Sequence, residues 1–262
     1  MSINETAQYL QSLRTGRERV DELPPALMPP DLAAAYQAQA ALVDGLCAHW
    51  GGETAGYKVA LTNPAAQRML GVPYPVFGRL FTARLHESGV TLRAADYVIR
   101  LIEVEIAFRM AADVPAIEGG HNRRSIAEHV GALYPAIELV EHHFAGLDRF
   151  TPESFAADIA IHSAWIHGAP VDDWRGLDLA AQRTRLLVNG EEKLTGSGGN
   201  VLGHPLEVMA WLANELPRHG LALSRGDFVT TGVTTDVIYP AEAGERLTAD
   251  FPGIGRVELD FE

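Results

Sequence analysis

The chain is poor in cysteine, has no long apolar run and carries fewer basic than acidic side chains. Cys47 is the single cysteine among 262 residues, which excludes an internal disulfide framework and a cysteine-rich zinc site. Cys47 falls in a helical pattern, where a buried thiol is expected. No stretch approaches the ~18 consecutive apolar residues of a membrane helix, and residues 1–15 lack the apolar core of a secretory signal peptide. We therefore expect a cytoplasmic protein.

The charge balance also excludes one class of partner. The chain has 21 Lys and Arg against 34 Asp and Glu, a formal net charge of −13. Binding the phosphates of nucleic acid requires a basic surface, so nucleic acid is not an expected partner. The hydrophobic fraction of 47% and the charged fraction of 21% are ordinary for a soluble globular protein.

Helical patterns dominate the first third of the chain and strand patterns dominate the rest. Helices are expected at residues 3–15, 32–50 (capped by Asp31), 62–70 (capped by Thr62), 123–133 and 204–218. Strands are expected at residues 56–61, 100–110, 134–142, 162–168, 226–232, 246–251 and 256–261, with a hairpin at 182–195 around Asn189-Gly190. Residues 155–161 fit either type. The order predicts an α+β fold.

The strand expected at residues 100–110 has two acids on one face. Its alternation places Ile102, Val104, Ile106 and Phe108 on one side and Leu101, Glu103, Glu105 and Ala107 on the other, which is typical of a half-buried strand. Residues two apart on a strand are separated by roughly 6.6 Å and point the same way. Two carboxylates on a largely apolar face are costly unless a cation binds them, and Mg²⁺ prefers oxygen ligands. The alternative is a solvated sheet face.

Two further polar residues lie on expected strands. Glu138 alternates with Ala136 and Val140 on the strand expected at 134–142, so it is a third acid from a second strand. Lys58 lies on a short strand among apolar neighbours, which would lower its pKa and suit proton transfer. The alternative for Lys58 is a surface lysine on an edge strand.

The remaining polar motifs are less specific. His142 and His143 follow the strand of Glu138 and are expected to face solvent. The glycine-rich stretch at 196–199 lacks the Lys-Ser/Thr of a phosphate-binding loop and is expected to border the site. No Gly-x-Ser-x-Gly elbow is present, which argues against a serine hydrolase.

Five segments in register resemble the 2-keto-4-pentenoate hydratase and 4-oxalocrotonate decarboxylase family, which belongs to the fumarylacetoacetate hydrolase superfamily. They are Gly-Tyr-Lys-Val-Ala-Leu-Thr (56–62), Leu-Gly-Val…Phe-Gly (70–78), Glu-Val-Glu-Ile-Ala-Phe (103–108), Pro-Ala-Ile-Glu-Leu-Val (135–140) and Gly-Asp-Phe-Val-Thr-Thr-Gly (226–232). The resemblance covers nearly the whole chain.

The resemblance implies a fold, a metal and a set of site residues. It implies a helical N-terminal region (1–85) packed on a metal-binding mixed β-roll (86–262), and a homo-oligomer that can associate with a partner enzyme of the same pathway. It implies Mg²⁺ or Mn²⁺ held by Glu103, Glu105 and Glu138, with Lys58 in the active site. Thr231, Gly232 and Thr235 match the segment that contacts the substrate carboxylate.

The chain departs from the family pattern at four positions. Val76 stands where relatives often have an acid, Ile159 where an asparagine is usual, His162 among small residues and Val233 where a serine is usual. His162 could supply the acid–base group missing at Val76, although a structural role is the alternative. The metal ligands are kept while their surroundings differ, which indicates an altered substrate or reaction.

The implied reaction is hydration of a 2-hydroxy-2,4-dienoate in aromatic catabolism, through a cation that chelates the 2-oxo acid. Decarboxylation of a 4-oxalocrotonate-like diacid, or carbon–carbon hydrolysis of an acylpyruvate, would use the same metal site. A non-catalytic metal-binding homologue or partner subunit is the third alternative.

Overall fold

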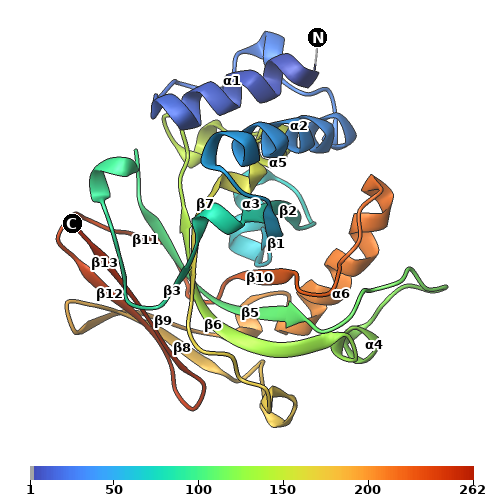
Figure 1. Cartoon of the computed structure of the whole chain (residues 1–262), viewed down its shortest axis with the longest axis vertical. Helices are drawn as coiled ribbons and strands as arrows, with labels where there is room; N and C mark the ends of the chain where they lie inside the picture. The colour runs from blue at the N-terminus through green and yellow to red at the C-terminus, as the bar shows by residue number, and fades with distance from the viewer. Residues whose placement is uncertain (1–2) are drawn as a thin grey trace.

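The computed structural model describes residues 3–262 and has the expected α+β architecture (Figure 1). Its α-helices are α1 (Ile3–Gly16), α2 (Leu32–Trp50), α3 (Pro64–Leu70), α4 (Arg123–Ala127), α5 (Pro152–Ala157) and α6 (Pro205–Glu215). None of the helices in this described part is long and apolar enough to cross a membrane.

The strands form two sheets. The strands are β1 (Thr54–Ala60), β2 (Val76–Phe81), β3 (Leu85–Glu87), β4 (Val90–Leu92), β5 (Leu101–Met110), β6 (Val130–Val140), β7 (His162–His167), β8 (Arg183–Val188), β9 (Glu191–Ser197), β10 (Phe228–Val233), β11 (Tyr239–Pro240), β12 (Arg246–Phe251) and β13 (Gly255–Phe261). An eight-stranded sheet has the order β2-β1-β10-β5-β6-β7-β3, with β11 also paired to β5. A five-stranded sheet has the order β4-β13-β12-β8-β9.

The eight-stranded sheet joins distant parts of the chain. Most of its pairs are antiparallel, but β1 pairs with β10 in parallel, so residues 56–58 lie beside residues 228–230. β1 and β2 precede residue 85 and yet belong to this sheet. Residues 1–85 thus contribute strands as well as helices, and a domain division at residue 85 stays a prediction.

The helices lie at the margins of the sheets. In Figure 1, α1 and α2 form a layer at the top of the view with α5 beneath them, and α4 and α6 lie together at the opposite side of the large sheet. Asp31 caps α2 as expected, because its carboxylate accepts from the Ala34 amide at 2.8 Å. The N-cap of α3 is Asn63 and not Thr62, since the Asn63 side chain accepts from the Ala66 amide.

The structure corrects several further expectations. The helix expected at 123–133 ends at Ala127, because β6 begins at Val130 and pairs with β5. β5 is buried on both faces except at Arg109, so it is not half-buried. Cys47 is partly exposed.

His142 and His143 do not face solvent: they are 3% and 1% exposed. Burial lowers the pKa of both imidazoles, that of His143 to about 4.

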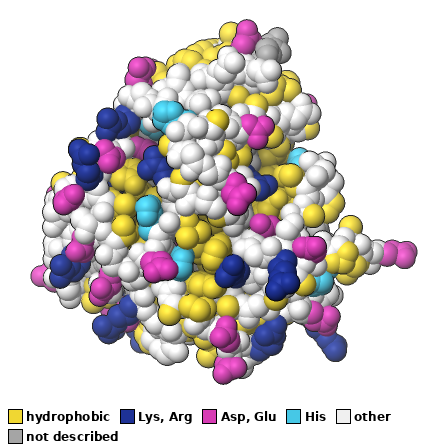
Figure 2. Space-filling view, viewed as in Figure 1, with side chains coloured by type: hydrophobic (Ala, Val, Ile, Leu, Met, Phe, Trp, Pro, Cys, Tyr) yellow, Lys and Arg dark blue, Asp and Glu magenta, His cyan; other side chains and the backbone are white. Residues whose placement is uncertain are grey.

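The surface carries both signs of charge. Acidic and basic side chains are interspersed on the face seen in Figure 2, without a large region of one sign. This distribution fits the small-molecule expectation better than a polyanionic partner.

Candidate metal centre

The register of β5 and β6 brings the three predicted acids together. Glu103 lies directly opposite Glu138, and Glu105 follows two residues later on the same face of β5. One carboxylate oxygen from each of the three lies within 4.8 Å of the others. Like charges directly opposite each other destabilise a sheet, so this arrangement calls for a compensating cation.

The three carboxylates are buried and incompletely bonded. Glu105 and Glu138 are 0% exposed and Glu103 is 7% exposed. Thr230 on β10 donates from its hydroxyl to Oε2 of Glu105. Glu105 Oε1 and Glu138 Oε2 are buried without a hydrogen-bond partner among the described residues. Buried unpartnered carboxylate oxygens are costly, and hard oxygen donors are what Mg²⁺ or Mn²⁺ prefers. The residues present fit a divalent cation.

Among residues 3–262, Lys58 is the one lysine or arginine that directly contacts the acid trio. Its ammonium lies 3.2 Å from Oε1 of Glu138 and donates to the carbonyl of Ala160 at 2.9 Å. It is 1% exposed. Burial lowers the pKa of Lys58, but Glu138, Glu103 and Glu105 outweigh burial and the pKa is raised. The expectation of a lowered pKa is wrong because it counted only the apolar neighbours.

The pKa values of two equally buried acids, Glu105 and Glu138, shift in opposite directions. Burial and the neighbouring Glu138 and Glu103 raise the pKa of Glu105 well above its usual value. Burial also acts on Glu138, but Lys58 and His162 outweigh it and the pKa of Glu138 is lowered. With all three carboxylates ionised, one ammonium would leave two negative charges without a counter-charge. A divalent cation supplies the missing charge.

His162 at the start of β7 contacts the trio through Glu138. Its Nδ1 lies 2.7 Å from Oε1 of Glu138, the same oxygen that faces Lys58. The ring is 0% exposed, and its Nε2 has no partner among the described residues. Burial lowers the pKa of His162, which favours a neutral ring that donates from Nδ1 to the carboxylate.

A small cavity opens beside Lys58 and Glu103. Its volume is about 50 Å³, and its other walls are mainly apolar side chains, among them Met69, Leu147, Phe155 and Ile161. Gly232 also lines this cavity.

Of the three predicted substrate-contacting residues, only Gly232 lines this cavity. Thr235 instead lines a neighbouring groove of about 470 Å³ with Thr62 and Asn200. Thr231 is 0% exposed and donates its hydroxyl to the carbonyl of Ile106. Gly199 of the glycine-rich stretch lines the same groove as Thr235.

The backbone that contacts Lys58 is strained. Ile159, Ala160 and Ile161, between α5 and β7, have positive φ angles of 50°, 50° and 58°. For residues with a Cβ, the left-handed conformation costs about 1–2 kcal/mol each, and such strain clusters at functional sites. Gly78 of β2 permits this turn to approach, since a Cβ there would lie 2.2 Å from the carbonyl oxygen of Ile159.

Sequence reasoning missed some residues around the trio. One of them is Thr230, which directly precedes Thr231 and Gly232. Thr230 and Phe228 are two residues apart on β10, so the strand period could have placed both on one face. The Ala160 carbonyl and the left-handed turn had no signal, because isoleucine disfavours that conformation. Val76 is fully buried at the start of β2.

Comparisons with known proteins extend these observations. A family profile described as "Fumarylacetoacetate (FAA) hydrolase C-terminal" matches residues 65–262. A 2-keto-4-pentenoate hydratase from Paraburkholderia phymatum is 32% identical over 263 residues, covering 99% of this chain and 97% of the relative. A 2-hydroxyhexa-2,4-dienoate hydratase from Comamonas testosteroni is 31% identical over 79% of this chain and 77% of its own.

A solved structure matches over the same extent. It is a 4-oxalocrotonate decarboxylase from Pseudomonas putida G7 complexed with magnesium and adipate, with a TM-score of 0.91 and 25% identity. The match covers 99% of this chain and 97% of that one.

Proposed function

Because the chain belongs to the fumarylacetoacetate hydrolase family, we propose that it is a divalent-metal-dependent hydro-lyase. It hydrates a 2-hydroxy-2,4-dienoate of the 2-keto-4-pentenoate type to a 4-hydroxy-2-oxo acid in aromatic catabolism. One observation carries the proposal: three buried carboxylates, two of them with an unpartnered oxygen, lie against a buried lysine beside a cavity. The hydratases among its relatives support the choice of reaction.

The metal ligands in this proposal are Glu103, Glu105 and Glu138, and the ion is Mg²⁺ or Mn²⁺. When bound, the ion would act as a Lewis acid on the 2-oxo carboxylate end of the substrate. The solved relative with magnesium supports a divalent ion of this kind. The protein itself holds the ligands close by sheet register, so little reorganisation is needed to assemble the site.

Lys58 is the proposed electrostatic partner of the substrate. Two of the three protons of its ammonium face Ala160 and Glu138, which leaves one for a ligand in the cavity. The contact with the Glu138 carboxylate at 3.2 Å favours the charged ammonium. A fixed positive charge stabilises the negative charge that develops on the 2-oxygen.

The overall reaction balances with water as the only co-reactant. The 2-hydroxyl proton is lost and C5 gains a proton, which leaves a 2-oxo-3-enoate. The oxygen of water then bonds to C4 and a proton to C3. The Lys58 ammonium, held in place by Glu138, is the charged group of the chain that would stabilise the negative charge developing on the 2-oxygen.

The proposed roles of the other predicted residues follow from their positions. His162 does not line the cavity, so its contact with Glu138 supports a role in orienting that ligand, and its acid–base role stays a prediction. Gly232 and Thr235, with Thr231 fixing β10 to β5, are proposed to form the substrate-binding segment.

Decarboxylation of a 4-oxalocrotonate-like diacid is the second candidate. The solved decarboxylase with magnesium and adipate favours it. Against it, the far wall of the cavity is apolar, and Lys58 is the only basic side chain that lines this cavity in the described part of the chain. A second carboxylate held inside this cavity would be desolvated without a cation, whereas one that reached the groove of Thr235 would meet Arg68. The preference for hydration therefore rests on the hydratases among the relatives.

The test measures loss of the dienol chromophore by ultraviolet absorbance with Mg²⁺ or Mn²⁺. We expect activity in the wild type, a loss of about a thousandfold in Glu105→Gln and normal activity in Glu192→Gln, whose acid is exposed on β9. Release of carbon dioxide from 2-oxohex-3-enedioate, without hydration of a dienoate, would instead identify a decarboxylase.

Inertness towards dienoates, oxo diacids and acylpyruvates would support the non-catalytic homologue or partner subunit. A homo-oligomer also remains a proposal, which light scattering after size exclusion would test.

A further inference from the structure

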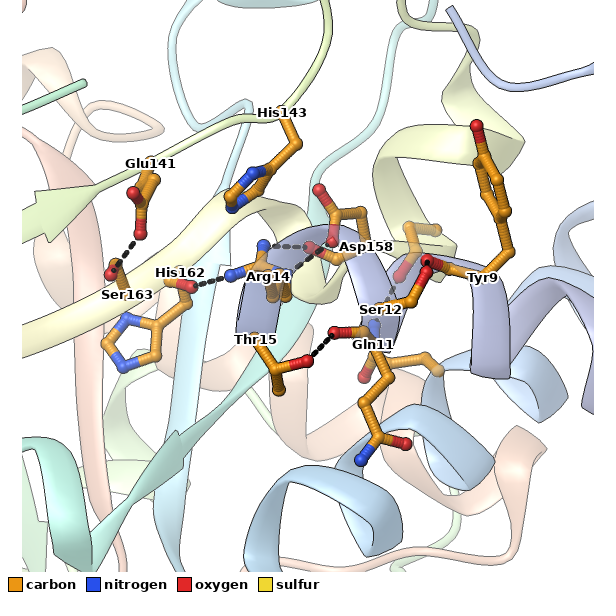
Figure 3. Close-up of polar contacts among 12 residues, drawn as sticks. Tyr9, Gln11, Ser12, Arg14, Thr15, Glu141, His143, Asp158, His162 and Ser163 are labelled. Atoms are coloured by element: carbon orange, nitrogen blue, oxygen red, sulfur yellow. Dashed lines mark hydrogen bonds and ion pairs between the residues drawn. The ribbon is translucent and has the colours of Figure 1, made fainter. Parts of the chain in front are cut away.

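Arg14 at the end of α1 reaches the candidate site from the helical layer. Figure 3 shows its guanidinium directed at Asp158 and at the backbone of His162. Its Nε donates to Oδ1 of Asp158 at 2.6 Å, its Nη2 to the carbonyl of Asp158 at 3.1 Å and its Nη1 to the carbonyl of His162 at 2.8 Å. The side chains of Arg14 and Asp158 are 3% and 2% exposed. One buried side chain therefore holds both ends of a five-residue segment.

The segment between these two ends is the left-handed turn of Ile159–Ile161. Its backbone would not adopt three consecutive positive φ angles on its own. It persists only where the surroundings over-determine it. The Arg14 hydrogen bonds and the close approach to Gly78 are two of the constraints on the turn, and the Glu141 amide adds a third by donating to the carbonyl of Ile161 at 2.9 Å.

Two contacts connect this turn to the acid trio and its lysine. The carbonyl of Ala160, at its centre, accepts from the Lys58 ammonium at 2.9 Å. The residue that ends it, His162, contacts Oε1 of Glu138 at 2.7 Å. The same oxygen of Glu138 is 3.2 Å from Lys58.

We propose that Arg14 is a positioning residue, which fixes the Lys58 ammonium and the Glu138 carboxylate by clamping the turn that contacts both. Arg14 does not touch the cavity. It acts through the backbone of residues 158–162. The kinetic part of this inference rests on the proposed hydro-lyase activity.

The planar fork of the guanidinium is required for this role. Arginine presents five donors in fixed directions and can bond a carboxylate and two carbonyls at once, whereas the lysine ammonium is a compact point charge. Arg14→Lys keeps the charge beside Asp158 and loses the clamp. The double variant Arg14→Gln with Asp158→Asn removes both charges, so neither is left buried and unpaired.

The first measurement is steady-state kinetics. We expect kcat to fall at least about tenfold in both variants, because small misplacements of catalytic groups are costly, while KM changes less than about threefold. The matched control is Arg185→Lys, which alters another Arg–Asp pair, 2.7 Å from Nε to Asp250 Oδ2, in the five-stranded sheet. Its kcat should remain unchanged.

The second measurement does not depend on activity. Lys58 and Lys193 are the two lysines of the chain, so selective ¹⁵N-lysine labelling gives two side-chain resonances. Lys193 is on the surface hairpin and serves as the internal reference. In the double variant, which adds no lysine, we expect the Lys58 resonance to shift or broaden and the Lys193 resonance to stay in place.

The outcomes separate the two proposals. If the wild type hydrates no dienoate, the proposed function fails, and the Lys58 resonance alone decides the role of Arg14. A folded double variant with wild-type kcat, or with an unmoved Lys58 resonance, overturns the positioning role. If neither variant folds, the pair acts only in stability and the proposal is rejected.

Discussion

A buried acid in each of the two sheets has different charged neighbours and an opposite pKa shift. Asp250 in the five-stranded sheet is 5% exposed and receives Arg185 and Arg256, each at 2.7 Å, on its two oxygens. Burial opposes ionisation of Asp250, but the hydrogen bonds from Arg256 and Arg185 prevail and lower its pKa. Glu105 in the eight-stranded sheet has two acids and only one shared lysine as charged neighbours, and its pKa is raised.

This contrast separates a structural acid from a candidate ligand. The chain supplies the counter-charges of Asp250 from its own arginines. It gives Glu138 one lysine, leaves Glu105 without a counter-charge of its own and leaves one oxygen of each unpartnered, so a further positive charge would have to come from outside the chain. Burial alone does not distinguish the two cases, whereas the inventory of partners does.

The largest change in activity is expected from the substitution of Glu105, the acid without a counter-charge. Glu105→Gln should lower activity by about a thousandfold, because transition-state charge stabilisation by a metal is worth several kcal/mol. The same variant should stabilise the metal-free protein, since it removes a buried like charge. Asp250→Asn should do the reverse: destabilisation by about 1–3 kcal/mol with activity retained. Kinetics and urea unfolding measure both, and equal loss of activity in the two variants would contradict the contrast.

A smaller loss is expected at the shared cation. Lys58→Met should reduce kcat by about a hundredfold, as for other groups that stabilise a developing negative charge. It should also destabilise the metal-free protein, because Glu138 loses its counter-charge. Lys193→Met is the matched control, since Lys193 pairs with Glu191 at the surface. A wild-type kcat in Lys58→Met would show that Lys58 does not stabilise the developing negative charge.

The pH dependence of stability should differ between the two acids. The folded-state pKa of Asp250 is lowered, so its contribution is present above about 3.8 and is lost as the pH falls through the folded value. The folded-state pKa of Glu105 is raised, so in metal-free protein its contribution is favourable in acid and is lost as the pH rises through that value. Accordingly, the gain in stability from Glu105→Gln should shrink on acidification. Urea titrations of metal-free protein at several pH values measure this, and a constant gain would contradict the assignment.

The smallest effect is expected in the strained turn. Ala160→Gly relieves one left-handed residue and should stabilise the protein by up to about 1 kcal/mol. Ala156→Gly, in the right-handed helix α5, should instead destabilise by about 1 kcal/mol. Thermal unfolding of the pair tests the sign, and destabilisation by both would show that the turn is not strained.

Local patterns predicted most elements and the acid trio. The alternation around Glu103 and Glu105 and the second acid strand at Glu138 depend only on the strand period, which the sequence carries. The hairpin at Asn189-Gly190 and the Asp31 cap are also local chemistry, and both are confirmed.

Tertiary constraints explain what local patterns did not predict. Residues 123–133 keep helical spacing at Ile126, Val130 and Leu133, yet pairing with β5 makes the second half a strand. The buried His142 and His143 and the pKa of Lys58 depend on neighbours distant in sequence. The role proposed for Arg14 depends on a contact 144 residues away.

The parallel pairing of β1 with β10 has a consequence for the order of folding. It sets Lys58 beside Thr230, and the acids of β5 and β6 join the same sheet. Pairing of such distant segments is slow, because loop-closure entropy is lost before contacts form. During synthesis the pocket cannot be completed until β10 has left the ribosome. Hydratase activity, which needs Lys58 and Gly232 beside the acids, would therefore report that β10 has joined the sheet, and truncated chains that lack β10 should show none.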